Sequence, residues 1–267
     1  MPSGEPSGTG STLAEAYDRY IGRYSHQLAR DLVRHSGVRP PQRALDVGCG
    51  PGALTTALVE TLGPRHVFAV DPSPDYVQAC RAHTPGVDVR LGVAEDLPFA
   101  DGEMDVVLAQ LVVNLLDDPE GGVAEMARVA RPHGVVAATV WAPGGMPLLE
   151  RFWEAALAVA PEAVAAIGET GRVGFGEEEL AHLWRTGGLA DVSVRPLHAT
   201  ASYEHIADLC EPIEAGVGRS GQLWRSLDQE SQAELRVRLY QGLGSPPGRF
   251  SLTAQAWCVR GTVTPDP

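Results

Sequence analysis

The run 44-ALDVGCGPGALT-55 places three glycines within five residues, between an apolar stretch and a helix-forming one. Glycine lets the backbone turn sharply after a strand and approach a bound ligand closely. With Ala53 counted after Gly48 and Gly50, the spacing also fits the dinucleotide pattern G-x-G-x-x-G/A. The turn therefore predicts a cofactor site and leaves the class of cofactor open.

Around this turn, short β-branched runs alternate with helical ones from Arg43 to Trp141. Runs that are apolar on both faces and separated by helix-length spacers predict a parallel, doubly wound α/β sheet, with its site at the carboxyl ends of the strands. The expected strands are 43-RALDVG, 66-HVFAVD, 87-VDVRLG, 104-MDVVLAQL and 134-GVVAATVW, and the expected helices are 52-GALTTALVETLG, 74-PDYVQACRAH and 118-DPEGGVAEMARVA.

After Trp141 the pattern becomes mainly helical, with two further strands. The last strand alternates apolar and polar residues, which is typical of an antiparallel edge hairpin that completes a seven-stranded sheet. Helices are expected at 146-MPLLERFWEAALAVAPEAVAAI, 177-EEELAHLWRTGGL, 201-ASYEHIADLCEPIEAG and 220-SGQLWRSLDQESQAELRVRLYQGL, and strands at 190-ADVSVRPL and 251-SLTAQAWCVRG. The expected units are a disordered leader (1–12), an N-terminal helical lid (13–40), a Rossmann-like cofactor-binding core (41–142), a helical substrate insertion (143–188) and a C-terminal part of the sheet with a helical insertion (189–267).

Composition narrows the classes of function. The net charge of -13 and the pI near 5.0 disfavour a nucleic-acid partner. All 21 basic residues are arginine, so lysine Schiff-base chemistry is excluded. Neither a membrane span nor a signal peptide is expected, which favours a cytoplasmic protein. The four cysteines form no CxxC pair, and no compact set of ligands suggests a metal, so metal-independent chemistry is expected.

Two residues of the turn bear on the cofactor. Asp46 ends the first strand, and a carboxylate directed into the crevice would repel pyrophosphate and attract a cationic amino group or sulfonium. Pro51 has no N–H to offer a phosphate. Asp71 ends the second strand, 23 residues beyond Gly48, where it can accept hydrogen bonds from ribose hydroxyls. Asp46 and Pro51 therefore disfavour a nicotinamide dinucleotide.

Four stretches together resemble the successive blocks of class I S-adenosylmethionine-dependent methyltransferases, close to the ubiquinone/menaquinone-biosynthesis-like (type 11) subgroup. They are 44-ALDVGCGPGALT, 67-VFAVDPSPDYV, 91-LGVAEDLPFADGEMDVVLAQ and 128-RVARPHGVVAATVW. The resemblance implies S-adenosylmethionine as the cofactor and S-adenosylhomocysteine as its product. It covers roughly Arg43 to Trp141 and depends on four blocks in order.

The resemblance also implies roles for single residues. Gly48, Cys49 and Gly50 would line the amino-acid moiety with Asp46, and Asp71 would bind the ribose. At the adenine, Pro72 would pack on the ring, Ala94 would donate its backbone N–H and Glu95 would lie alongside. Gln110 would lie near the sulfonium. One departure is Val93, which stands where family members often carry an aspartate for the adenine amino group.

The N-terminal segment 17-YDRYIGRYSHQLARDLVRHSG-37 places Tyr17, Tyr20 and Tyr24 on one helix face. This stripe is either packing surface or a lid in which Tyr20 or Tyr24 contacts the cofactor carboxylate and takes part in catalysis. His26 is the candidate general base, against the alternative of a surface or capping histidine. His198 and His205 are rival bases, and many methyl transfers need none.

We expect the substrate pocket to involve Tyr24, Asn114, Trp141, Phe152 and Tyr203, because the later insertions are rich in aromatic residues. The predicted function is methyl transfer to an O, N or C nucleophile of a small, aromatic acceptor such as a phenol, indole or polyketide ring, in a monomer or homodimer. Alternatives are a C-methyltransferase of quinone precursors, a protein on this scaffold that transfers no methyl group, and an NAD-dependent oxidoreductase.

Overall fold

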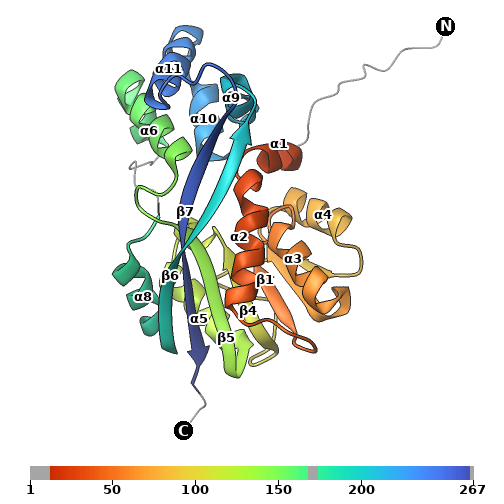
Figure 1. Cartoon of the computed structure of the whole chain (residues 1–267). Coiled ribbons are helices and arrows are strands. Elements are labelled where there is room, and N and C mark those ends of the chain that lie inside the picture. The colour runs from red at the N-terminus through yellow and green to blue at the C-terminus, as the bar shows by residue number, and fades with distance from the viewer. Residues whose placement is uncertain (1–12, 168–173, 265–267) are drawn as a thin grey trace, which may run out of the picture.

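A computed structural model of the chain describes residues 13–167 and 174–264, which are built around a seven-stranded sheet (Figure 1). The strand order is β3-β2-β1-β4-β5-β7-β6. Five neighbouring strands run parallel, and β7 is antiparallel to both β5 and β6. The strands are β1 (Ala44–Val47), β2 (Val67–Asp71), β3 (Asp88–Leu91), β4 (Met104–Gln110), β5 (Ala130–Trp141), β6 (Leu189–Tyr203) and β7 (Phe250–Val263). The predicted α/β sheet with an antiparallel last strand is confirmed.

Helices cover both faces of the sheet. Alternate residues of β4 show the two layers, because Val106 and Leu108 pack in the cluster that contains α2 and α3, whereas Val107 and Ala109 pack in the cluster of α5 and α8. The helices of these layers are α2 (Gly22–His35), α3 (Ala53–Leu62) and α4 (Pro74–His83) on one face, and α5 (Pro119–Val129) and α8 (Glu177–Thr186) on the other. The inner strands β1, β2, β4 and β5 contain continuous apolar runs because both of their faces are buried.

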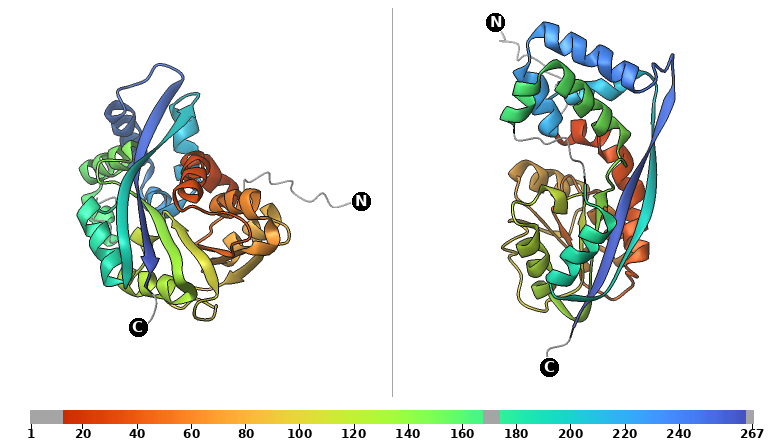
Figure 2. Two further views of the ribbon diagram at one scale, coloured as in Figure 1. Left: turned by 60° about the horizontal axis from the view of Figure 1, so that its bottom comes forward. Right: turned by 90° about the vertical axis from the view of Figure 1, so that its left-hand side faces the viewer.

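A second group of helices stands beyond the carboxyl ends of the parallel strands, where the long strands β6 and β7 extend to meet it (Figure 2). We call this group the helical cap. Its members are α6 (Pro147–Val159), α7 (Pro161–Ala166), α9 (Ile206–Glu214), α10 (Gly218–Ser226) and α11 (Gln229–Gly242). The short helix α1 (Leu13–Arg19) contacts both α4 and α9, so it lies between the cap and the sheet layers. Two 3-10 turns complete the described elements, η1 (Pro64–His66) and η2 (Val113–Leu115).

Three boundaries in the C-terminal half differ from the sequence prediction. The expected helix at 146–167 is interrupted before Pro161, whose ring and missing N–H disfavour a helix interior but suit a first turn. The helix expected from position 201 begins at Ile206, because Tyr203 still pairs with Phe250 in the sheet. The helix expected over 220–243 is two helices, and the Asp228 side chain caps the second.

The N-terminal segment differs from a simple lid. Helix α2 packs on α3 and on the sheet through the buried residues Leu28 and Leu32, so it is part of the sheet layers. Of the N-terminal segment, α1, the turn that follows it and the first turn of α2 reach the cap, where Arg23 pairs with Asp208 of α9. The leader expected at 1–12 lies outside the described residues.

The carboxyl group of Asp46 is buried behind the glycine turn. Its Oδ2 accepts a hydrogen bond from Thr55 Oγ1 on α3 at 2.6 Å, while Oδ1 has no hydrogen-bond partner. Burial raises the pKa of Asp46 to about 8, because the ionised form loses its hydration. This side chain joins β1 to α3 and is protonated over most of the range below pH 8.

This pKa predicts a pH-dependent stability. The unfolded carboxyl group ionises near pH 4, so the folded chain holds one more proton between roughly pH 4 and pH 8, and the free energy of unfolding falls as pH rises through this window. Asp46→Asn keeps an acceptor for Thr55 and removes the titration. In urea unfolding, the free energy of unfolding of the variant minus that of the natural chain should increase from pH 5 to pH 8, by at most about 1.4 kcal/mol per pH unit. If this difference in the free energy of unfolding stays constant over the pH range, the raised pKa of Asp46 is contradicted.

Candidate active site

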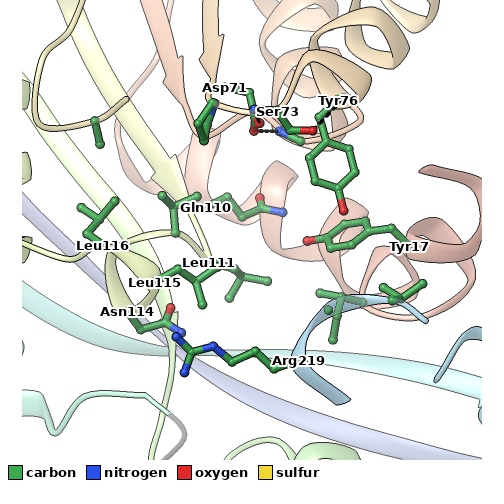
Figure 3. Close-up of a pocket in the computed structure, with 18 of the residues that line it drawn as sticks. Tyr17, Asp71, Ser73, Tyr76, Gln110, Leu111, Asn114, Leu115, Leu116 and Arg219 are labelled. Carbon is green, nitrogen blue, oxygen red and sulfur yellow. Dashed lines mark hydrogen bonds between the residues drawn. The ribbon is translucent and has the colours of Figure 1, made fainter. Parts of the chain in front are cut away.

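A cavity of about 770 Å³ opens at the carboxyl ends of β1, β2 and β4, between the sheet and the helical cap. This volume lies within the range of small-molecule sites. Asp71 lies at one end, Asn114 and Arg219 lie at the other, and Gln110 lies between them (Figure 3). The cavity therefore has two compartments, which we call the Asp71 end and the Arg219 end.

The glycine turn forms the floor of the Asp71 end. Gly48, Gly50 and Gly52 all adopt positive φ values, of 70°, 52° and 105°. At Gly48 there is also no room for a side chain, because a Cβ atom would lie 2.4 Å from Cγ2 of Val112. The first glycine is therefore required by both conformation and contact.

The N–H groups of this turn are engaged within the protein. Those of Gly48 and Cys49 both donate to the carbonyl of Val70, at 2.8 and 3.0 Å. The N–H of Gly50 donates to Asp71 Oδ2 at 2.9 Å, and that of Gly52 donates to the Cys49 carbonyl. Because Pro51 has no N–H, positions 48–52 present no uncommitted donor to a phosphate.

Asp71 is held at the edge of the cavity by two backbone amides. Besides Gly50, the N–H of Ser73 donates to its Oδ1 at 2.8 Å. Burial raises the pKa of Asp71, and these two hydrogen bonds oppose that effect by favouring the ionised form. The same oxygens have further lone pairs with which to accept hydroxyl groups. Pro72 lines the cavity next to it.

Two tyrosines close the Asp71 end from the side. The rings of Tyr17 and Tyr76 meet edge to face with centroids 5.8 Å apart, and Figure 3 shows their hydroxyl groups near each other. Burial raises the pKa of both phenols, so they stay protonated. Across the cavity, Val93 is 44% exposed and lies beside Ala94. This end combines aromatic and apolar walls with one carboxylate, which suits a nucleoside.

Gln110 and Asn114 line the middle and the far end of the cavity, and each has a buried amide oxygen without a hydrogen-bond partner. Gln110 Nε2 donates to the Ser25 carbonyl at 3.0 Å, which fixes the side chain. Its Oε1 and the Oδ1 of Asn114 are buried without a hydrogen-bond partner. A buried acceptor without a donor is costly, so these oxygens favour a bound ligand with positive charge or donor groups.

The Arg219 end is built by segments distant in sequence. Leu115 lies beside Asn114 at this end, and two tryptophans from other regions, Trp141 and Trp153, also line the cavity. Tyr20 from the N-terminal segment bonds Ser220 of α10 across the cavity, with 3.1 Å between the two hydroxyl oxygens. This link connects the turn after α1 to the first turn of α10.

Ten of the sequence-predicted site residues line the cavity. Nine of them come from the cofactor and substrate assignments at the strand ends and the tenth from the N-terminal stripe. They are Tyr20, Gly48, Gly50, Asp71, Pro72, Ala94, Glu95, Gln110, Asn114 and Trp141.

Four predicted catalytic or cofactor residues do not line it, and one of them, Tyr24, was also predicted to bind substrate and is packed in the core. His26 is exposed on α2, away from the cavity, so the structure does not support it as a base. Asp46 is buried behind the turn with its raised pKa, which corrects the expectation of an ionised carboxylate in the crevice. Cys49 turns its thiol towards Cys80, inside a small apolar cluster.

Three predicted substrate residues are also placed in the core. The hydroxyl oxygens of Tyr24 and Tyr203 lie 3.2 Å apart in a buried pair, and Tyr203 also stacks on Phe250. Phe152 packs inside the cap against Trp153. Their bulk stabilises the junction of sheet and cap, which corrects their assignment to the pocket wall.

The sequence reasoning assigned no site role to Ser73, Tyr76, Leu115, Arg219 or Ser220, all of which line the cavity. Ser73 and Tyr76 follow Asp71 at the start of α4, so a strand-end argument could have found them. Arg219 and Ser220 lie on α10, and nothing local in the sequence indicates that this helix meets α1.

Within the ranges 13–167 and 174–264, no group of His, Cys, Asp and Glu side chains is arranged to hold a metal ion. In the same ranges, no helix is both long and apolar enough to cross a bilayer.

Comparisons with known proteins identify a methyltransferase domain in this chain. Residues 45–138 match the model of a methyltransferase domain. A malonyl-[acyl-carrier protein] O-methyltransferase of Hahella chejuensis is 33% identical over 145 residues, which cover 54% of this chain and 52% of that protein. Nocamycin O-methyltransferase of Saccharothrix syringae is 36% identical over 169 residues, which cover 58% of this chain and 59% of that protein. The match thus spans little more than half the length of these relatives.

Among solved structures, an N-methyltransferase of Haemonchus contortus in complex with S-adenosylhomocysteine superposes with a TM-score of 0.55 at 17% identity, covering 96% of this chain and 61% of that one. At this identity the likeness concerns the fold. The matched domain contains β1, the glycine turn and Asp71, which form the Asp71 end of the cavity. Residues 45–138 of the chain therefore form a methyltransferase domain, and its fold is that of class I S-adenosylmethionine-dependent methyltransferases.

Proposed function

We propose that this chain transfers a methyl group from S-adenosylmethionine to an oxygen atom of a small, apolar or aromatic acceptor. The observation that carries the proposal is the two-compartment cavity, whose floor at Gly48 excludes any side chain. When bound, S-adenosylmethionine supplies a methyl group activated by its sulfonium. The chain's own residues need only bind, orient and exclude water.

The Asp71 end fits the cofactor in three respects. Asp71 can accept the ribose hydroxyls, and the Tyr17–Tyr76 pair and Val93 provide apolar surface for the adenine. Gln110 lies in the middle of the cavity, and its buried, unpaired Oε1 carries a partial negative charge that can stabilise a nearby sulfonium. The turn has no uncommitted N–H at positions 48–52 for a pyrophosphate, which disfavours a dinucleotide.

Oxygen as the acceptor atom is supported by the names of two relatives, both O-methyltransferases. The Saccharothrix relative acts, by its name, on nocamycin, which supports a natural product as acceptor. Trp141 and Trp153, which line the cavity, suit a flat or apolar acceptor. The proposal is tested by incubating the protein with methyl-labelled S-adenosylmethionine and a panel of phenols, acids and amines. A labelled O-methyl product identified by mass spectrometry is expected, and cofactor binding without any labelled product would contradict transfer.

Gly48→Ala should abolish cofactor binding. The new methyl group would meet Val112 and the backbone would keep an unfavourable φ of 70°, so the floor of the cavity must shift. Gly37→Ala is a matched control, because Gly37 has a φ of 69°, no atom near the added methyl group and no place in the cavity. Calorimetry should show S-adenosylhomocysteine affinity falling at least about tenfold in the first variant and staying unchanged in the second. Equal affinities in the two variants would contradict the role of the turn.

Tyr20→Phe and Tyr24→Phe should separate a site residue from a core residue. The first variant breaks the link to Ser220 across the cavity, and the second breaks the buried pair with Tyr203 away from it. Each should lower the free energy of unfolding by about 1 kcal/mol. Only Tyr20→Phe should weaken S-adenosylhomocysteine binding, by several fold in calorimetry. Unchanged binding in both variants would exclude Tyr20 from a role in binding the cofactor.

A further inference from the structure

The Arg219 end contains the only positive charge among the described residues that line the cavity. The other ionisable groups there are carboxyl and phenol groups, and no lysine exists in the chain. Figure 3 shows the guanidinium of Arg219 reaching the side chain of Asn114, across the cavity from Asp71. Arginine presents five N–H donors in a planar fork, so it can hold a planar anion as well as a partner of its own.

Among the described residues that line the cavity, the candidates for a general base are carboxylates. No histidine lines the cavity within the described residues, and His26 lies outside it. Tyr20 is bonded to Ser220, and burial raises its pKa, so its phenol stays protonated. Asp71 lies at the opposite end, held by two backbone amides. Carboxylates such as Asp117 are weak bases towards a neutral alcohol. A neutral acceptor that must lose a proton would have only a weak base to accept it here. An acceptor that is already ionised needs no base.

We propose that the acceptor is a carboxylic acid, bound as its carboxylate by the guanidinium of Arg219 and the side-chain NH2 of Asn114 and converted to a methyl ester. This inference rests on the proposed function. The side-chain amide of Asn114 supplies a polar partner beside the guanidinium, and Leu115, Trp141 and Trp153 contact the apolar part of the acid.

The transfer balances without a base. A carboxylate oxygen forms the bond to the methyl carbon as the carbon–sulfur bond breaks, and the electron pair of that bond returns to sulfur. No proton is released, because the acid enters ionised. An anion and a sulfonium become two neutral products, so charge decreases on the way to the transition state, and the apolar walls favour that decrease. The ester no longer pairs with Arg219, which favours its release.

The first test measures binding, and calorimetry is performed on protein saturated with S-adenosylhomocysteine. The probes are two pairs of nearly equal shape, 3-phenylpropanoate with 3-phenylpropanamide and octanoate with octanamide. In at least one pair the acid should bind at least about tenfold more tightly than the amide. Arg219→Gln should reduce that preference to less than about threefold while leaving the affinity for S-adenosylhomocysteine unchanged.

Arg238→Gln is the matched control, because Arg238 is a cap arginine that pairs with Glu234 on α11 and does not line the cavity. It should keep the full preference for the acid. A second measurement uses methyl-labelled S-adenosylmethionine with each acid and its matching alcohol, 3-phenylpropanol or octanol. Methyl esters should form, and Arg219→Gln should raise the KM for the acid about tenfold with a much smaller change in kcat.

The outcomes separate this inference from the proposed function. Equal binding of acid and amide in both pairs, or methylation of alcohols in preference to acids, would overturn the carboxylate acceptor and leave the methyltransferase intact. An unchanged acid preference in Arg219→Gln would also overturn it. Failure of the natural protein to bind S-adenosylhomocysteine at all would overturn the proposed function itself, and the carboxylate acceptor with it.

Discussion

The candidate site depends on the way the glycine turn satisfies its own backbone. Gly48 and Cys49 share the Val70 carbonyl, and Gly50 donates to Asp71, so the end of β1 is bonded to the end of β2. The Cβ-free backbone of Gly48 lets Val112 approach from the loop after β4. Three strand ends are thereby brought together around one floor. Any side chain at position 48 would separate them, which is why the first glycine matters more than the spacing of all three.

The hydrogen bonds within the glycine turn, rather than the charge of Asp46, explain why a dinucleotide is disfavoured. The sequence reasoning relied on an ionised Asp46 in the crevice, but that carboxyl group is buried against Thr55 and its pKa is raised to about 8. The better reason is that the turn's N–H groups at positions 48, 49, 50 and 52 are committed inside the protein and Pro51 has none. A pyrophosphate needs such donors, whereas a ligand with a positively charged amino acid moiety does not.

Sequence patterns predicted the sheet well because its strands and helices are each indicated by their own local sequence. The inner parallel strands are short apolar runs, the crossover helices α4 and α5 begin at the side-chain caps Ser73 and Asp118, and Asp71 ends its strand as expected. Strand ends meet at one edge of a parallel sheet, so the cofactor end of the cavity follows from topology. The exception, Asp46, shows that a residue's position on a strand does not fix the direction of its side chain relative to a turn.

The acceptor end could not be predicted in the same way. It joins Tyr20 from the N-terminal segment, Asn114 after β4 and Arg219 from α10, and the 200 positions between Tyr20 and Ser220 carry no local sign of their contact. The tyrosines of the N-terminal stripe likewise differ in their surroundings, because Tyr20 lines the cavity and Tyr24 pairs with Tyr203 in the core. Helical spacing predicted a shared face, but the partners across that face are set by tertiary packing.

The central claim is that this turn and cavity take S-adenosylmethionine in preference to a dinucleotide. Parallel calorimetric titrations of the natural protein with S-adenosylhomocysteine and with NADH test it most directly. The account predicts saturable binding of one S-adenosylhomocysteine per chain and no detectable heat with NADH. Saturable binding of NADH, with no binding of S-adenosylhomocysteine, would contradict it.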